Sequence, residues 1–176
     1  MRSRILPKEF FIRPALFVAR ELLGKFLVVS KNGKTISRMI TEVEAYDGFR
    51  DKASHASRGK TERNAPMFST GGIWYVYFVY GMHEMLNIVT GPKEYPAAVL
   101  LRGIEGYSGP GKLTKQLGIS HVYNGLSASR KTGLWIEDRG VYIPTSRIKK
   151  SPRIGVDYAG PVWAKKRYRF FIFPRI

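Results

Sequence analysis

Residues 41–87 read TEVEAYDGFRDKASHASRGKTERNAPMFSTGGIWYVYFVYGMHEMLN, and the strand patterns at the two ends of this stretch decide the fold class. The stretch begins in the last part of a strand, which we expect to run from about Thr35 into Glu44. This strand follows Asn32-Gly33, the signature of a tight hairpin turn. At the other end, Trp74–Tyr80 is an unbroken aromatic and β-branched run, which is typical of a strand. Another strand is expected at Met85–Val89. These patterns predict antiparallel hairpins.

The rest of the chain adds few helices. Apolar residues recur at helical spacing over Pro14–Leu23, and Gly24 can end that helix. Asp47–Gly72 is a polar connection, and one this long is usually functional or locally structured. The pattern predicts an α+β or open-barrel domain with antiparallel pairing. Further expected elements are a turn near Gly81-Met82-His83, strands at Lys25–Ser30, Ala97–Ile104 and Tyr168–Phe173, and a short helix at Lys112–Gly118.

The charge balance points to a polyanionic partner. The chain has 176 residues with 30 Lys and Arg against 13 Asp and Glu, which gives a formal net charge of +17. Such an imbalance destabilises the compact state by self-repulsion, and a phosphate backbone would neutralise it. An anionic membrane surface is the competing partner, but no long basic amphipathic helix and no membrane-spanning apolar run is present in the sequence.

The composition also excludes several classes of site. Cysteine is absent, so disulfides, thiolate metal sites and iron–sulfur clusters are excluded. The chain opens without a signal-peptide pattern. We therefore expect an intracellular protein of the cytoplasm or nucleoid.

A carboxylate near the phosphates of a bound polyanion suggests a function, because its charge repels that ligand. Glu42, Glu44 and Tyr46 alternate, so they would share one face of a strand. Solvated surface glutamates are common, but a carboxylate within reach of water can also remove its proton during attack. His55 could be a base, a metal ligand or a polar core residue; the three histidines lack metal-site spacing, so we expect no metal.

Other features leave two readings open. Tyr46, Tyr77 and the neighbouring aromatics could be sheet packing or stacking platforms for bases. Gly109-Pro110-Gly111-Lys112 lacks the full spacing of a nucleotide phosphate loop, so it is either an ordinary turn or a contact to one DNA phosphate. Lys149-Lys150 and Lys165-Lys166-Arg167 could be a solvated face or a contact to a nucleic-acid backbone.

Taken together, the motifs resemble the alkyladenine (3-methyladenine) DNA glycosylase family. The resemblance runs through most of the chain, and the order of its elements is specific. The motifs are Leu6-Pro7, Ala19–Lys25, Glu42-Val43-Glu44-Ala45-Tyr46, Ala53-Ser54-His55, Thr61–Phe68, Tyr75–Met82 with Asn87, Val99–Arg102, Gly109–Leu113 and Trp163–Lys166.

This resemblance implies a fold and an activity. The expected fold is a single domain over residues 1–176, built on a curved, open barrel-like antiparallel sheet with a few peripheral helices and a protruding β-hairpin. The expected activity is repair of DNA: an alkylated, or also deaminated, purine is flipped from the duplex and its N-glycosidic bond is hydrolysed. The resemblance also implies a monomer that needs no cofactor. Its expected partner is double-stranded DNA with damaged purines, and the strand is expected to stay uncut.

The resemblance also assigns roles at the reacting centre. Glu44 would be the general base that activates the attacking water, and Arg102 would position that water. Tyr77 on one side, with Tyr46 and His55 on the other, would sandwich the flipped purine, and the His55 main-chain amide would read its 6-position edge.

Other residues would select the base or hold the DNA. Asn87 would sit where the exocyclic amine of ordinary guanine clashes, and Tyr80 would enter the minor groove. Thr61, Arg63 and Lys112 match positions that touch the DNA backbone.

Two alternatives remain from the residues alone. A non-catalytic nucleic-acid-binding protein explains the charge and the aromatic strands but gives Glu44 no role. A metal-dependent nuclease would use clustered carboxylates, and Glu42, Glu44, Asp47 and Asp51 lie close in sequence. The preferred damaged base, and the roles of Arg58, Glu62 and Glu84, do not follow from the motifs.

Overall fold

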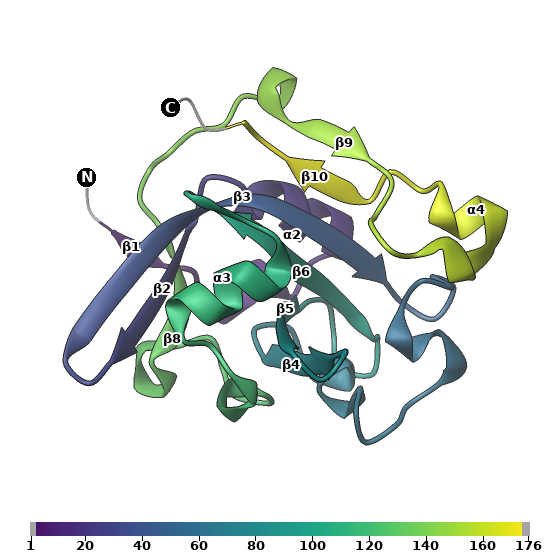
Figure 1. Cartoon of the computed structure of the whole chain (residues 1–176), viewed down its shortest axis with the longest axis horizontal. Helices are drawn as coiled ribbons and strands as arrows, with labels where there is room; N and C mark the ends of the chain where they lie inside the picture. Colours follow the sequence, from purple (N-terminus) through teal and green to yellow (C-terminus); the bar gives the residue numbers. More distant parts are fainter. Residues whose placement is uncertain (1–2, 174–176) are drawn as a thin grey trace.

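A computed structural model describes residues 3–173, and the expected domain limits at residues 1–2 and 174–176 lie outside them. The described chain forms one large antiparallel sheet with short helices around it (Figure 1). Its strands are β1 (Arg4–Ile5), β2 (Phe26–Lys31), β3 (Lys34–Asp47), β4 (Trp74–Val79), β5 (His83–Val89), β6 (Ala97–Ile104), β7 (Tyr107–Ser108), β8 (Leu134–Asp138), β9 (Lys149–Ser151) and β10 (Arg169–Phe171). The α-helices are α1 (Lys8–Phe11), α2 (Ala15–Leu22), α3 (Pro110–Leu117) and α4 (Gly160–Ala164).

The long strand β3 joins the two halves of the sheet. The strand order is β1-β8-β2-β3-β6-β5-β4. Residues 34–39 of β3 pair with β2, whereas residues 40–47 pair with β6. β10 pairs with β3 at residues 42–44, so Glu42 and Glu44 lie on a strand with neighbours on both edges.

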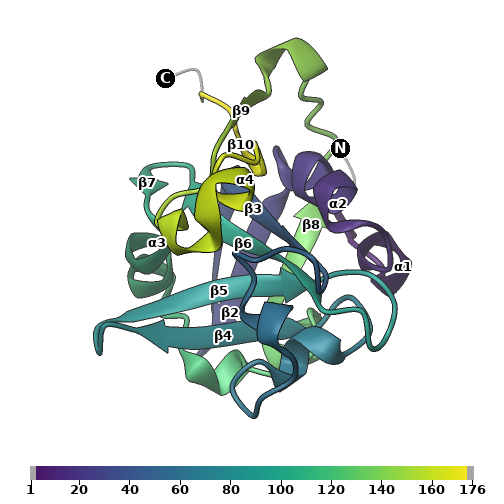
Figure 2. The same ribbon diagram turned by 90° about the vertical axis from the view of Figure 1, so that its right-hand side faces the viewer.

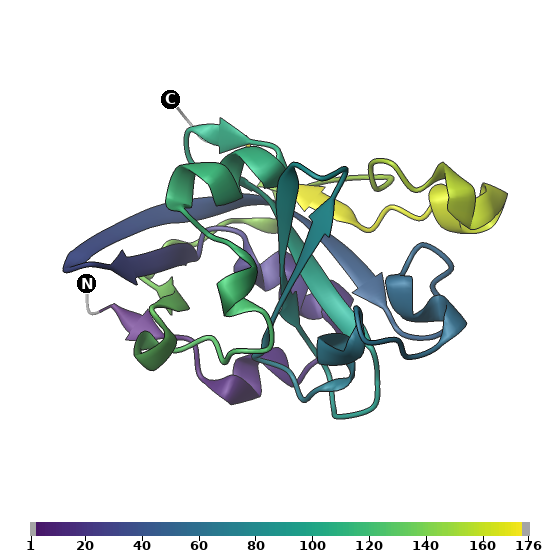
Figure 3. The ribbon, with the colours of Figure 1, turned by 60° about the horizontal axis from the view of Figure 1, so that its bottom comes forward.

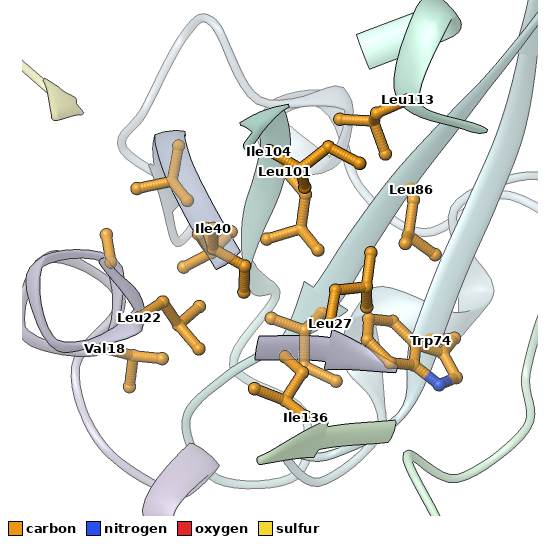
Figure 4. Packing of buried hydrophobic residues seen from close by; sticks show 14 of the residues in the cluster. Val18, Leu22, Leu27, Ile40, Trp74, Leu86, Leu101, Ile104, Leu113 and Ile136 are labelled. Carbon is orange, nitrogen blue, oxygen red and sulfur yellow. The ribbon is translucent and has the colours of Figure 1, made fainter. Parts of the chain in front are cut away.

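The two faces of the β3–β6–β5–β4 half of the sheet differ. Val43, Ala45, Val99 and Leu101 are buried in the main core, which also receives Leu22 from α2. Figure 4 shows this packing. Side chains that alternate with these residues, beginning with Glu42, Glu44 and Tyr46, therefore point to the opposite face.

The pair β4–β5 forms a hairpin whose tip reaches beyond the body of the protein (Figure 2). Tyr80 at the tip has a backbone φ of 52° and Gly81 has 63°, so both lie in the left-handed region. The Met82 N–H donates to the Val79 carbonyl oxygen at 3.1 Å and closes the turn. Tyr80 is 90% exposed, which excludes the alternative that it packs in the core.

The strand and helix predictions are confirmed in kind and corrected at their ends. Ala97–Ile104 is β6 as predicted, and Asn32 and Gly33 have the positive φ values of the predicted tight turn. The predicted strand at 74–80 stops at Val79 because Tyr80 takes a positive φ. The predicted helix at 112–118 begins two residues earlier, since Pro110 fits the first helical turn.

The expected α+β class is confirmed: the sheet is antiparallel and not closed, and the helices are few and short. A connection as long as residues 47–72 was expected to be functional or locally structured. It contains two 3₁₀ helices, η1 (His55–Arg58) and η2 (Ala65–Phe68), so it is locally structured. Four more 3₁₀ helices are η3 (His121–Tyr123), η4 (Arg130–Thr132), η5 (Thr145–Arg147) and η6 (Asp157–Ala159). Over residues 3–173, every helix is too short or too polar to cross a bilayer.

Candidate active site

One row of residues across four strands forms the floor of the site. Glu44 on β3 lies opposite Leu100 on β6, Leu100 opposite Asn87 on β5, and Asn87 opposite Tyr75 on β4. A cavity of about 400 Å³ lies over this face of the sheet. Its lining includes the same-face neighbours of that row, namely Tyr46, Tyr77, Met85, Ala98 and Arg102.

The Glu44 carboxylate is fully buried just behind the cavity wall. One oxygen accepts a hydrogen bond from the Ile154 N–H at 2.8 Å, and the other accepts one from the Tyr46 hydroxyl at 3.0 Å. The Arg102 Nε lies 3.5 Å from the first oxygen. All three partners line the cavity, so the carboxylate is one layer removed from its interior.

Arg102 is held between two carboxylates. Its Nε donates to Glu42 Oε1 at 3.1 Å while it lies beside Glu44. The same Glu42 oxygen accepts from Arg169 Nε at 2.7 Å. Glu42 therefore positions the two arginines, whereas Glu44 faces the cavity-lining groups.

The environment of Glu44 acts on its pKa in two directions. Burial raises the pKa of this carboxyl above its ordinary 4.5, because the charged form loses its water. Arg102, the Ile154 amide, Tyr46 and Arg153 oppose that rise by stabilising the carboxylate. A pKa moved towards neutrality is what a general base requires.

The aromatic residues form two separate walls rather than the expected arrangement. His55 and Tyr77 have ring centroids 4.6 Å apart in an edge contact, and His55 Nδ1 lies 3.1 Å from the Tyr75 hydroxyl. A flat ring cannot enter between two rings that already touch. His55, Tyr75 and Tyr77 thus share one wall, whereas Tyr46 packs with a different cluster around Val156. The expected sandwich with Tyr46 and His55 on the same side is therefore corrected.

Burial changes the protonation of this wall. Burial lowers the pKa of His55, with a smaller effect from the Arg63 charge, so a neutral imidazole is favoured. Burial also raises the pKa of Tyr75 to about 12, so its hydroxyl stays protonated near neutral pH.

An ion pair that the sequence did not reveal supports the opposite wall. Arg153 and Asp51 are both fully buried and joined by two hydrogen bonds. Arg153 also donates to the Ala45 carbonyl oxygen at 2.8 Å, and its guanidinium lies 4.8 Å from the Tyr46 ring centroid. Because Ile154 follows directly, this pair fixes the amide that binds Glu44.

Two buried asparagines hold the backbone around the cavity. The Asn87 side-chain amide donates to the carbonyl oxygens of Tyr75 and Met85, at 3.1 and 3.2 Å. The Asn64 amide donates to the carbonyl oxygens of His55 and Gly59, at 3.1 and 3.0 Å. Asn64 therefore positions the His55 turn, a role that no sequence pattern had suggested.

The three expected backbone-contact residues lie outside the cavity lining, and Arg63 and Lys112 lie near the hairpin. Arg63 donates to the Phe78 carbonyl oxygen at 3.1 Å, and its guanidinium lies 5.4 Å from the Tyr77 ring centroid. The Thr61 hydroxyl accepts from the Asn64 N–H at 3.3 Å. Lys112 is exposed on α3, and α3 lies close to the hairpin at Gly111.

The start of α3 and the hairpin approach each other closely. A Cβ on Gly111 would come within 2.8 Å of the His83 ring, so only glycine fits without a shift. Glu84 strengthens this join, since its carboxylate accepts from the His121 N–H at 3.1 Å and its carbonyl accepts from the Thr114 hydroxyl at 3.0 Å.

Comparison with known proteins bears on what this site is for. The sequence profile described as "Methylpurine-DNA glycosylase (MPG)" matches residues 9–174. The chain belongs to this family. It is therefore a DNA glycosylase, a class of hydrolase that cleaves the N-glycosidic bond of a nucleotide.

Individual relatives agree over nearly the whole chain. A protein of Myxococcus xanthus named "Putative 3-methyladenine DNA glycosylase" is 42% identical over 95% of this chain and 89% of its own length. Proteins with the same name from Methanocella arvoryzae and from Wolbachia sp. subsp. Brugia malayi are each 42% identical, over 95% and 98% of this chain and 92% and 100% of their own lengths. The expected family membership is thus confirmed.

The buried pair Asp51–Arg153 yields a prediction about stability. Asp51→Asn should lower the free energy of unfolding by about 3 kcal/mol, because it leaves a buried guanidinium without its counter-charge. Urea denaturation followed by circular dichroism measures this.

The matched control is Glu21→Gln, which breaks the partly exposed Arg13–Glu21 pair. It should change the free energy of unfolding by less than about 1 kcal/mol. Equal effects of the two substitutions would show that the buried pair carries no special structural role.

Proposed function

We propose that this DNA glycosylase removes alkylated purines, and also deaminated ones, by water attack in which Glu44 is the general base. The observation that carries the proposal is the Glu44 carboxylate, buried beside the cavity and held by Ile154, Tyr46 and Arg102. The reaction starts base excision repair on duplex DNA.

Water must come between Glu44 and the sugar. Each carboxylate oxygen has a second lone pair beyond the hydrogen bond it already accepts. A water entering from the cavity beside Arg102 can donate to one of these lone pairs and present its own lone pair to C1′ of the flipped nucleotide. As the C1′–O bond forms, the proton passes to Glu44 and the C1′–N bond electrons leave with the base.

The charge on Glu44 helps the step as well. Loss of the base builds positive charge on the sugar, and a nearby carboxylate stabilises it. An alkylated purine is cationic, so it leaves readily and stacks well on electron-rich rings. We propose that it lies between Tyr46 and the wall of Tyr77 and His55, with Asn87 at the edge that excludes guanine.

The enzyme is proposed to be monofunctional. Strand cutting by a glycosylase would need an amine nucleophile at the sugar, and within residues 3–173 the cavity lining contains no lysine. The product would be an intact strand with one base missing.

The remaining residues are proposed to hold the duplex. Tyr80, exposed at the hairpin tip, would fill the space of the flipped nucleotide from the minor groove. Arg63 and Lys112 lie near the same hairpin, and these two residues and Thr61 would contact phosphates. We propose that the protein acts as a monomer on duplex DNA.

The carboxylates give the nuclease alternative little support. Glu42 is bound by two arginines, Asp51 by Arg153, and Asp47 accepts a hydrogen bond from Tyr95. In the part of the chain that the structure describes, they form no group suited to a metal ion. A purely binding protein, in turn, would have no use for a buried carboxylate beside its ligand pocket.

Glu44→Gln tests the central assignment. The amide cannot accept the proton of the water, so single-turnover release of methylated base should fall by a factor of about 100 or more. Affinity for lesion-containing duplex, measured by fluorescence anisotropy, should stay within about twofold, because the shape of the pocket is kept.

Glu42→Gln is the matched control on the same face of β3. Its amide oxygen can still accept from Arg102 and Arg169, so the rate should fall much less than with Glu44→Gln. Excision at near the unmodified rate by the Glu44 variant would refute the assignment.

The wild-type protein should also continue to excise bases in excess EDTA. Loss of activity that magnesium restores would favour the nuclease alternative.

The pH dependence of excision provides a separate prediction. Glu44 acts as a base only when ionised, so the rate should fall as pH drops through its pKa. Because burial raises that pKa, the acid limb should lie above pH 4.5. Arg102→Gln removes a charge that lowers the pKa, so it should move the limb to higher pH; a limb that shifts to lower pH contradicts the role of this pair.

Tyr80→Ser tests the wedge. Since the side chain is 90% exposed, the free energy of unfolding should change by less than about 0.5 kcal/mol. Excision from duplex DNA should fall, because nothing replaces the flipped nucleotide in the stack, whereas a single-stranded substrate should be affected less. Tyr80→Phe keeps the ring and should restore duplex excision. A stable Tyr80→Ser protein with unimpaired duplex excision would refute the wedge.

A further inference from the structure

A second groove continues from the base cavity. It has a volume of about 970 Å³ and shares Ser54, His55 and Tyr158 with the cavity. The groove runs between the segment of residues 49–58 and α4, which lie side by side at the right of Figures 1 and 3. Of the residues that line it, the proposed excision chemistry uses only His55.

The groove is basic, and its cations lack carboxylate partners. Arg50, Lys52 and Arg58 line it, are exposed, and form no salt bridge with any residue in the described range 3–173. Asp51 lies between two of them in sequence but turns inward, where Arg153 takes up its charge. The positive charges of the groove are therefore left to face solvent.

Aromatic rings stand between these cations. Phe49 is 50% exposed and Tyr158 is 67% exposed, and Trp163 also lines the groove. The Lys166 Nζ lies 5.6 Å from the Trp163 ring centroid and adds a fourth cation. Exposed rings alternating with unpaired cations are the pattern that binds single-stranded nucleic acid.

We propose that this groove is a second DNA-binding site, which holds a stretch of single-stranded DNA next to the base cavity. Its cations pair with phosphates, and bases stack on Phe49 and Trp163. A duplex does not fit this chemistry, because its bases are already stacked on one another and only its phosphates are available. Tyr158 lines both spaces, so a bound strand can lie across the mouth of the base cavity.

The site goes beyond the proposed excision reaction and does not depend on it. Binding needs Phe49, Trp163 and the groove cations, none of which lines the base cavity. An undamaged oligonucleotide can therefore test it, whatever the outcome of the Glu44 experiment.

Anisotropy of a fluorescein-labelled oligo(dT) measures the binding. The double variant Arg50→Ser/Lys52→Ser should weaken affinity and lower the slope of log affinity against log salt by roughly 1.4, or 0.7 for each strand phosphate. Phe49→Leu keeps apolar bulk against Phe68 but removes the flat ring, and it should weaken binding by about tenfold.

Lys31→Ser/Lys34→Ser is the matched control, because it removes the same charge at the β2–β3 hairpin, at the opposite side of the molecule in Figure 1. It should leave the salt slope unchanged. Thermal unfolding of each variant checks that the fold is intact.

Three results would overturn the proposal. Equal losses in the two double variants would mean that only net charge matters. Unchanged affinity in Phe49→Leu would remove base stacking. An equal loss for an undamaged duplex of the same length would make the occupant double-stranded.

Discussion

The buried charge of Glu44 is the constraint on which the site depends. An ionised carboxylate without contact with water is strongly destabilising unless hydrogen bonds and opposite charges surround it. Here β3 places Glu44 between two neighbouring strands, so its backbone cannot yield to relieve that burial. The chain instead brings the Ile154 amide, the Tyr46 hydroxyl and two arginines to it. Each of these groups also shapes the cavity or its support, so compensating one charge organises the whole site.

The sheet and the segments over it divide the work. The row Glu44–Leu100–Asn87–Tyr75 crosses four hydrogen-bonded strands, and its spacing is set by backbone pairing. The wall on the Tyr46 side comes from residues 51–54 and 153–158, which are held by the Asp51–Arg153 ion pair and by a hydrogen bond from the Tyr158 hydroxyl to the Ala53 carbonyl oxygen. A base pocket built this way has a rigid floor and a wall whose position depends on one buried ion pair and a few hydrogen bonds. The Asp51–Arg153 pair is thus a support for the proposed chemistry although neither residue meets the substrate in our mechanism.

How much of this the sequence could predict depends on whether the signal is local. The Asn32-Gly33 turn and β6 were predictable, because turn chemistry and strand propensity act over a few residues. The alternation of Glu42, Glu44 and Tyr46 on one face was predictable for the same reason. Strand propensity alone extended the strand through Tyr80, and the place of Tyr80 on a protruding hairpin was expected from the family resemblance. The partner of Asp51 was not, since Arg153 lies 102 residues further along the chain and nothing near either residue marks the pair. The separation of His55 and Tyr77 from Tyr46 likewise follows from packing into two clusters, which no linear pattern encodes.

The backbone at the hairpin tip is strained at Tyr80, which indicates a role other than stability for this residue. A tyrosine with a φ of 52° is disfavoured relative to glycine or asparagine, and a 90% exposed ring adds no packing to offset that strain. Stability alone would therefore favour a different residue at position 80. The strands that carry the tip are the ones that carry Tyr75, Tyr77 and Asn87, so the tip and the cavity floor belong to one rigid hairpin. A ligand that contacts Tyr80 therefore lies in a fixed position relative to the cavity. The proposed mechanism requires this, because Tyr80 would take the place of a nucleotide whose base the cavity then binds.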